Sequence, residues 1–134
     1  MAKLTTPFFH ILSCVVTENN VDWSQFNHLT PRDWEFFYTL SKKQGVVSII
    51  FEAIKNIPKE NVPPKSVTLK WLSNALSIEQ VMKKKEAVAV ELAEKLSDKG
   101  IQIVVLKGLA YASYYPNPYH RESGDLDCYL LGLK

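Results

Sequence analysis

Residues 100–108 read GIQIVVLKG, and they separate two kinds of sequence pattern. Gly100 closes a long helical pattern, and the apolar run after it, residues 101–106, is rich in β-branched side chains. Such side chains favour strands, and a short continuous apolar run is typical of a strand that is buried. The sequence therefore predicts a buried strand over residues 101–106, which ends at Lys107 and Gly108.

The pattern after this strand predicts one short helix and a second strand. Residues 108–115 have helical character, which Pro116 and Pro118 end. Residues 121–124 predict a polar loop, and residues 125–131 predict the second strand. Because two strands seldom form a stable sheet alone, this segment needs covering helices, a second copy of the chain or further residues.

The chain before residue 100 is predicted to be helical. Thr30, Pro31 and Asp33 supply an N-cap, a proline at the first helical position and an acid in the first turn. Gly45 suits the left-handed end of that helix. The other predicted helices cover residues 7–16, 46–57 and 66–98.

The pattern over residues 66–98 has two interpretations. It is one helix of about 50 Å, at about 1.5 Å per residue, or it is two shorter helices, because Ser77 and Gln80 have the spacing of an internal capping box. Together the elements predict an α+β protein, with a helical region over residues 1–99 and the start of an incomplete sheet over residues 100–134.

The composition is that of a folded globular domain. The 134 residues are 46% hydrophobic and 22% charged, and the net charge of +2 is too small to indicate nucleic-acid or membrane binding. No apolar run approaches the ~18 residues of a membrane-spanning helix. Cys14 and Cys128 match no zinc-site spacing, and we expect both to be free thiols in a cytoplasmic protein.

Two acids at the start of the second predicted strand are the strongest candidates for chemistry. Asp125 and Asp127 are separated by one residue, so on a strand both carboxylates face one side while Leu126 faces the other. Two carboxylates on a rigid strand suit Mg²⁺, which keeps several waters and recruits substrate phosphates. An Asp-Leu-Asp also occurs as a structural turn without a metal, and the residues alone leave both interpretations open.

Three further residues complete the candidate site. Gly108, between a predicted strand and a predicted helix, lets a phosphate approach the backbone at the helix N-terminus. Lys107 and Arg121 add positive charge that suits a polyphosphate. Together with the two acids, they describe a site for a nucleotide polyphosphate with Mg²⁺ as cofactor. The alternative is that Gly108 serves packing alone, that Arg121 pairs with Glu122 on the surface and that Lys107 is a solvated strand end.

Other polar and aromatic residues have two interpretations each. The lysine run at residues 83–85 indicates a nucleic-acid patch or a solvated helix face, and we favour the second because consecutive helical positions point in different directions. The tyrosines within residues 111–119 either stack on a base or, as we favour, pack with their polar tips in water. His120, next to Arg121, is a candidate phosphate ligand with no assigned catalytic role.

The segment from Leu106 to Leu130 resembles the uncharacterised nucleotidyltransferase family of the polymerase-beta-like superfamily. Members of that family have Leu-Lys-Gly, a short helix that ends in Tyr-Pro, and Arg-x-x-Gly-Asp-hydrophobic-Asp. In this sequence the three motifs occupy residues 106–108, 115–116 and 121–127.

The resemblance implies an activity and a role for each motif residue. Asp125 and Asp127 would hold Mg²⁺ against the triphosphate of an NTP, with ATP the expected nucleotide. Gly108 would form the phosphate-facing turn, while Lys107 and Arg121 would contact phosphates or order the acids. The reaction implied is transfer of a nucleoside monophosphate from the NTP to a hydroxyl acceptor, with release of pyrophosphate.

The sequence departs from the superfamily pattern at two points. Leu109 stands where the superfamily usually has Gly or Ser, and the usual third carboxylate of a later strand is absent because the sequence ends seven residues after Asp127. We therefore expect this chain to be truncated and catalytically inactive on its own. The alternative, from another functional class, is a non-catalytic helical interaction module in which Asp125 and Asp127 are structural.

Overall fold

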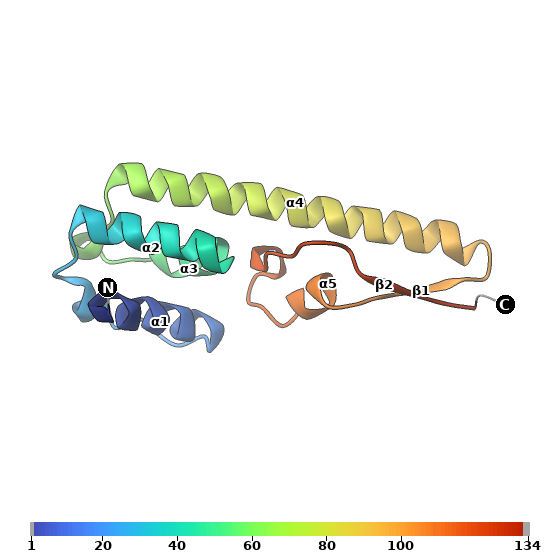
Figure 1. Cartoon of the computed structure of the whole chain (residues 1–134), viewed down its shortest axis with the longest axis horizontal. Coiled ribbons are helices and arrows are strands. Elements are labelled where there is room, and N and C mark those ends of the chain that lie inside the picture. Colours follow the sequence, from blue (N-terminus) through green and yellow to red (C-terminus); the bar gives the residue numbers. More distant parts are fainter. Residues whose placement is uncertain (1, 133–134) are drawn as a thin grey trace. The chain divides into compact units, whose positions relative to one another are not determined.

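The computed structural model describes residues 2–132. The chain forms two compact units, the first ending at Leu76 and the second beginning at Ser77. The boundary lies inside α4 (Lys65–Ser97), which Figure 1 shows as one uninterrupted helix that belongs partly to each unit. The sequence pattern over residues 66–98 fits one helix or two, and the structure has one. Ser77 and Gln80 lie in the interior of α4 and start no helix.

The first unit contains three shorter helices as well as the start of α4. These are α1 (Ala2–Val16), α2 (Pro31–Gln44) and α3 (Val47–Ile54), with short 3-10 turns at Trp23–Phe26 and Lys59–Asn61. Helix α1 begins five residues before the predicted start, so Pro7 lies inside it. Helix α3 ends three residues before the predicted end at residue 57.

Helix α2 begins and ends as its sequence predicts. The Thr30 side chain accepts a hydrogen bond from the Asp33 backbone N–H, and the Asp33 carboxylate accepts one from the Thr30 N–H at 2.7 Å. This reciprocal capping box satisfies backbone donors that the first helical turn leaves without partners. Gly45 ends the helix with φ 65°, a left-handed conformation that glycine adopts without a steric penalty.

Aromatic side chains form the core of the first unit. The Phe37 ring is fully buried and lies 5.8 Å from the ring of Phe8, 6.4 Å from that of Phe26 and 5.6 Å from that of Trp34. Trp71 of α4 is also fully buried, with its ring 5.4 Å from that of Tyr38. Edge-on contacts of this kind add to the stabilisation from apolar burial.

The second unit contains the rest of α4 and all of the sheet. After α4 come β1 (Gln102–Val105), α5 (Gly108–Ala112), a 3-10 turn at Pro118–His120 and β2 (Cys128–Leu131). The two strands pair antiparallel, with Gln102 opposite Leu131 and Val105 opposite Cys128. The predicted α+β class with an open, incomplete sheet is confirmed.

The strand β1 is less buried than its sequence predicts. Ile103 and Val105 are half-buried, whereas Val104 and Leu106 are exposed. The prediction of a buried strand was therefore wrong, because only one face of this two-stranded sheet is covered. A strand that is buried on both faces needs a second covering layer, as in a sheet that lies between layers of helices.

Two element boundaries in the second unit differ from the sequence pattern by three residues, whereas β1 differs by one residue at each end. Strand β2 begins at Cys128, three residues after the predicted start at Asp125, and α5 ends at Ala112 instead of residue 115.

Within residues 2–132, no helix combines the length and apolar character needed to cross a membrane.

Candidate functional site

Two turns of the second unit meet at Gly108. One turn joins β1 to α5 at Lys107 and Gly108, and the other comprises residues 121–124 ahead of β2. A Cβ at position 108 would lie 2.8 Å from the Cβ of Ser123, which is closer than such atoms approach. A guanidinium nitrogen of Arg121, Nη1, also donates to the Gly108 carbonyl oxygen at 3.3 Å. Glycine is therefore required here so that the two turns can pack together.

Lys107, in the first turn, forms an ion pair with one of the two acids. Its Nζ lies 3.3 Å from Oδ2 of Asp127, and both side chains are largely exposed. The Lys107 backbone has φ 49° and ψ −115°, a conformation that residues with a Cβ rarely adopt. Backbone strain of this kind costs of order 1–3 kcal/mol and persists only where the surroundings impose it, often at binding sites.

The two acids lie ahead of β2 rather than on it. The Asp127 carbonyl oxygen accepts the Leu106 N–H at 2.8 Å, which extends the strand pairing by one residue. Asp125 lies in a bend and is exposed, and no described residue donates a hydrogen bond to its carboxylate. The rule that alternate residues of a strand face one side therefore does not apply to this pair, because Asp125 lies outside the extended segment.

The family comparison covers most of the chain and includes both turns. Residues 30–131 match the model of a family described as "Uncharacterised nucleotidyltransferase". The chain belongs to this nucleotidyltransferase family. No curated protein and no solved structure matches the chain.

The predicted nucleotidyltransferase residues are thus partly brought together. Lys107 contacts Asp127, and Arg121 contacts Gly108, whereas Asp125 has no such contact with a described residue. Two exposed carboxylates offer the hard oxygen ligands that Mg²⁺ prefers, with positions left for water and phosphate. Within the described residues, no group of three or more His, Cys, Asp or Glu side chains is arranged to hold a metal ion.

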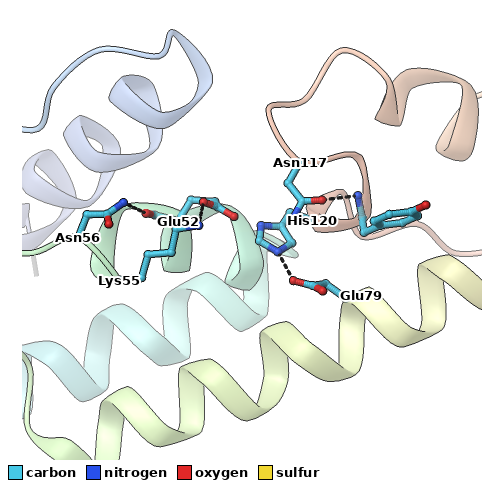
Figure 2. Close-up of polar contacts among 7 residues, drawn as sticks. Glu52, Lys55, Asn56, Glu79, Asn117 and His120 are labelled. Carbon is cyan, nitrogen blue, oxygen red and sulfur yellow. Dashed lines mark hydrogen bonds and ion pairs between the residues drawn. The ribbon is translucent and has the colours of Figure 1, made fainter.

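A buried histidine joins the segment between α5 and β2 to helix α4. His120 is 4% exposed, and its Nε2 donates to Oε1 of Glu79 at 2.7 Å, as Figure 2 shows. The hydrogen bond from His120, reinforced by the charges of His120 and Lys83, lowers the pKa of Glu79 despite its partial burial. The hypothesis that His120 binds phosphate was therefore wrong, because this ring nitrogen is engaged by a carboxylate and the ring is buried.

Tyr119 makes a second contact with α4. Its hydroxyl donates to Oε2 of Glu86 at 2.7 Å, and this hydrogen bond, with the charge of Glu86, raises the pKa of Tyr119. The ammonium of Lys83 lies 5.1 Å from the centre of the Tyr119 ring. Tyr119 therefore packs against α4 with a polar tip that is exposed, as predicted. Tyr111 and Tyr114 of the same group are less packed, because their side chains are 55% and 83% exposed.

Lys85 makes a third contact that the sequence interpretation missed. Its Nζ donates to the carbonyl oxygens of Ser123 and Gly124, the two residues directly before Asp125. The lysine run is therefore not a uniform solvated face. The available signal was the recurrence of Glu79, Met82, Lys85 and Glu86 at helical spacing, which puts these side chains on one side of α4.

Proposed function

We propose that the chain binds the triphosphate of an NTP, with ATP the expected nucleotide, at the two turns that meet at Gly108. Asp125 and Asp127 are the proposed Mg²⁺ ligands, and Lys107 and Arg121 are the proposed phosphate contacts. The reaction served by this site is transfer of a nucleoside monophosphate to a hydroxyl acceptor, with release of pyrophosphate. Nucleotidyltransferases in general use NTP substrates and divalent metals, which supports this choice of ligands.

The observation that carries the proposal is the pairing of Lys107 with Asp127. An ammonium 3.3 Å from a carboxylate oxygen puts one cation-binding and one anion-binding group of the motif side by side. A metal-bound triphosphate carries both kinds of charge, so it can replace this ion pair with two separate contacts. Both side chains are largely exposed, so a ligand can reach them without opening a core.

Mg²⁺ at these carboxylates would neutralise charge on the triphosphate and stabilise the leaving pyrophosphate. The chain's own residues position the nucleotide. The strained turn at Lys107 presents the ammonium, and Arg121 keeps its guanidinium beside Gly108 through the bond to the carbonyl oxygen.

We further propose that this chain by itself binds nucleotide without turning it over. The superfamily pattern requires a third carboxylate, and no third acid joins Asp125 and Asp127 in a metal-binding group among the described residues. We also propose that it acts in the cytoplasm, which agrees with the free thiols of Cys14 and Cys128.

Calorimetric titration with ATP in the presence of Mg²⁺ tests the binding site. We expect heat of binding for the wild type and none for Asp125→Ala/Asp127→Ala. The matched control is Asp98→Ala, which removes an exposed acid from the turn between α4 and β1 and should bind as the wild type does. Equal heats for wild type and the double variant, or no heat for the wild type, would contradict the proposal.

Pyrophosphate release under the same conditions tests the second part. We expect none from the chain alone. Release that depends on Asp125 and Asp127 would show that the chain supplies every catalytic group and would overturn the proposal of binding without turnover.

A further inference from the structure

We propose that Lys85 is a positioning residue for the nucleotide site, because its ammonium fixes the turn from which Asp125 and Asp127 emerge. This inference rests on the proposed function, since it names the group that sets the geometry of the same site. It assigns Lys85 no contact with metal or nucleotide.

The contacts of Lys85 are directed at the backbone of a single turn. Its Nζ donates to the carbonyl oxygens of Ser123 and Gly124, and the side chain is half-buried. Hydrogen bonds with a charged donor are about twice as strong as neutral ones. Two consecutive carbonyls bound to one ammonium must both point toward α4, so the peptide planes ahead of Asp125 have fixed directions.

The same turn is restrained on its other sides. The Ser123 side chain packs against Gly108, and its hydroxyl lies 3.5 Å from the sulfur of Met82. Beyond the acids, the Asp127 carbonyl is fixed by the Leu106 N–H. Asp125 and Asp127 therefore lie between two anchor points, the Lys85 contacts and the first hydrogen bond of the strand pair. Without the Lys85 hydrogen bonds, only side-chain packing would restrain the turn ahead of Asp125.

The neighbouring lysines have different surroundings. Lys83 lies 3.6 Å from a Glu79 carboxylate oxygen and over the Tyr119 ring, as described above. Lys84 is exposed, and its side chain makes no hydrogen bond or ion pair with the part of the chain that the structure describes. Lys84 is therefore a matched control that removes the same charge from an adjacent position of the same helix.

The direction of the change in metal affinity separates positioning from a simple effect of charge. Removing a cation near two carboxylates strengthens Mg²⁺ binding if Lys85 acts only through its charge. Removing the anchor of the turn weakens Mg²⁺ binding, because the two ligands lose their fixed backbone. Loss of groups that orient metal ligands typically lowers metal affinity by about 10- to 100-fold.

The experiment compares Mg²⁺ binding by calorimetry in the wild type, Lys85→Met, Lys85→Arg and Lys84→Met. Methionine keeps most of the aliphatic stem and removes the donor, while arginine keeps a charged donor. We expect roughly ten-fold weaker Mg²⁺ binding for Lys85→Met, partial recovery for Lys85→Arg and no change for Lys84→Met. Unchanged or tighter Mg²⁺ binding by Lys85→Met would overturn the inference.

Amide hydrogen exchange provides a readout that does not depend on the metal. We expect the Leu106 amide, which donates to Asp127, to exchange faster in Lys85→Met than in Lys84→Met, while the far-ultraviolet circular dichroism stays the same. If the wild type binds no ATP in the presence of Mg²⁺, the proposed function fails, and the exchange rate alone then decides whether Lys85 holds the turn. Equal exchange at Leu106 in the two variants overturns the inference in either case.

Discussion

The two compact units are stabilised by different kinds of contact. In the first unit, large apolar side chains from all four helices are buried, including Phe8, Phe37, Ile50 and Trp71. In the described part of the second unit, the buried residues are Met82, Ala89, Ala112 and His120. The segment between α5 and β2 is tied to α4 by polar side chains instead: His120 to Glu79, Tyr119 to Glu86 and Lys85 to two carbonyls.

This difference has consequences for stability and for the site. Burial of apolar surface is non-directional and large in free energy, so it decides whether a unit folds. A hydrogen bond contributes only about 1 kcal/mol net but is directional, so it decides where a loop lies. Substitutions in the first unit should therefore change stability most, and substitutions in the second should change site geometry at a smaller cost in stability.

The largest expected effect comes from the aromatic core of the first unit. Phe37→Ala removes a fully buried ring that contacts three other aromatic rings. We expect a loss of about 3–5 kcal/mol in the free energy of unfolding, measured by denaturant titration. Phe9→Ala is the control, because Phe9 is 55% exposed, and it should cost well under half as much. Equal losses in the two variants would contradict the description of this core.

The next effect concerns the contact between the two turns. Gly108→Ala forces a Cβ to within 2.8 Å of the Ser123 Cβ, so the turns must separate. We expect a loss of about 1–3 kcal/mol and weaker binding of ATP with Mg²⁺, measured by thermal unfolding and calorimetry. At Gly124 an added Cβ meets nothing within 4 Å, and Gly124→Ala should leave both properties nearly unchanged. A Gly108→Ala variant with wild-type stability would show that the turns do not pack this closely.

The features that the sequence predicted correctly depend on neighbouring residues. The start of α2 follows from Thr30, Pro31 and Asp33, and its end follows from Gly45, because a cap needs only side chains within a few positions. The turn at Lys107 and Gly108 likewise lies between a strand and a helix, as their neighbours predict, whereas their part in a nucleotide site stays a prediction. The start of β2 was placed too early because alternation continued through Asp125, although aspartate is unfavourable in strands.

The features that the sequence did not predict join residues far apart in the chain. Lys85 and Ser123 are 38 positions apart, and His120 and Glu79 are 41 positions apart. A lysine in a run of three carries no mark of which one will meet a carbonyl oxygen. The burial of His120 likewise depends on a loop that returns to α4. Such contacts arise from tertiary packing. Helical spacing puts Glu79, Lys85 and Glu86 on one side of α4, but it does not show which segment packs there.

A smaller effect is expected from the charge of Glu79. Its pKa is lowered in the folded protein from an ordinary value of 4.5, so its contribution to stability is present above that value and is lost as the pH falls through the folded-state pKa. Glu79→Gln keeps an acceptor for His120 but removes the charge. We expect it to cost about 1 kcal/mol near pH 6 and less as the pH falls toward 3, where the wild type loses the same charge, measured by denaturant titration at each pH. A difference that persisted undiminished at pH 3 would contradict this origin.

The smallest expected change in stability comes from the strained turn at Lys107. Two substitutions there separate the strain of the Lys107 backbone from the charge of its side chain. Lys107→Gly relieves a backbone conformation that suits glycine, but glycine also gains freedom in the unfolded chain, so the net gain in stability should be below about 1 kcal/mol. Lys107→Met removes the same ammonium and keeps the strain, so it should gain no stability. Both variants should bind ATP with Mg²⁺ more weakly than the wild type, because each loses the proposed phosphate contact. Thermal unfolding and calorimetry on the two variants therefore separate the effect of strain from the effect of charge.

If Lys107→Met is as stable as Lys107→Gly, the turn is not strained. If both variants bind ATP with wild-type affinity, Lys107 does not belong to the site. The expected combination, in which only glycine stabilises and both substitutions weaken ATP binding, would mean that the polar second unit retains a small instability at the residue proposed to contact the nucleotide.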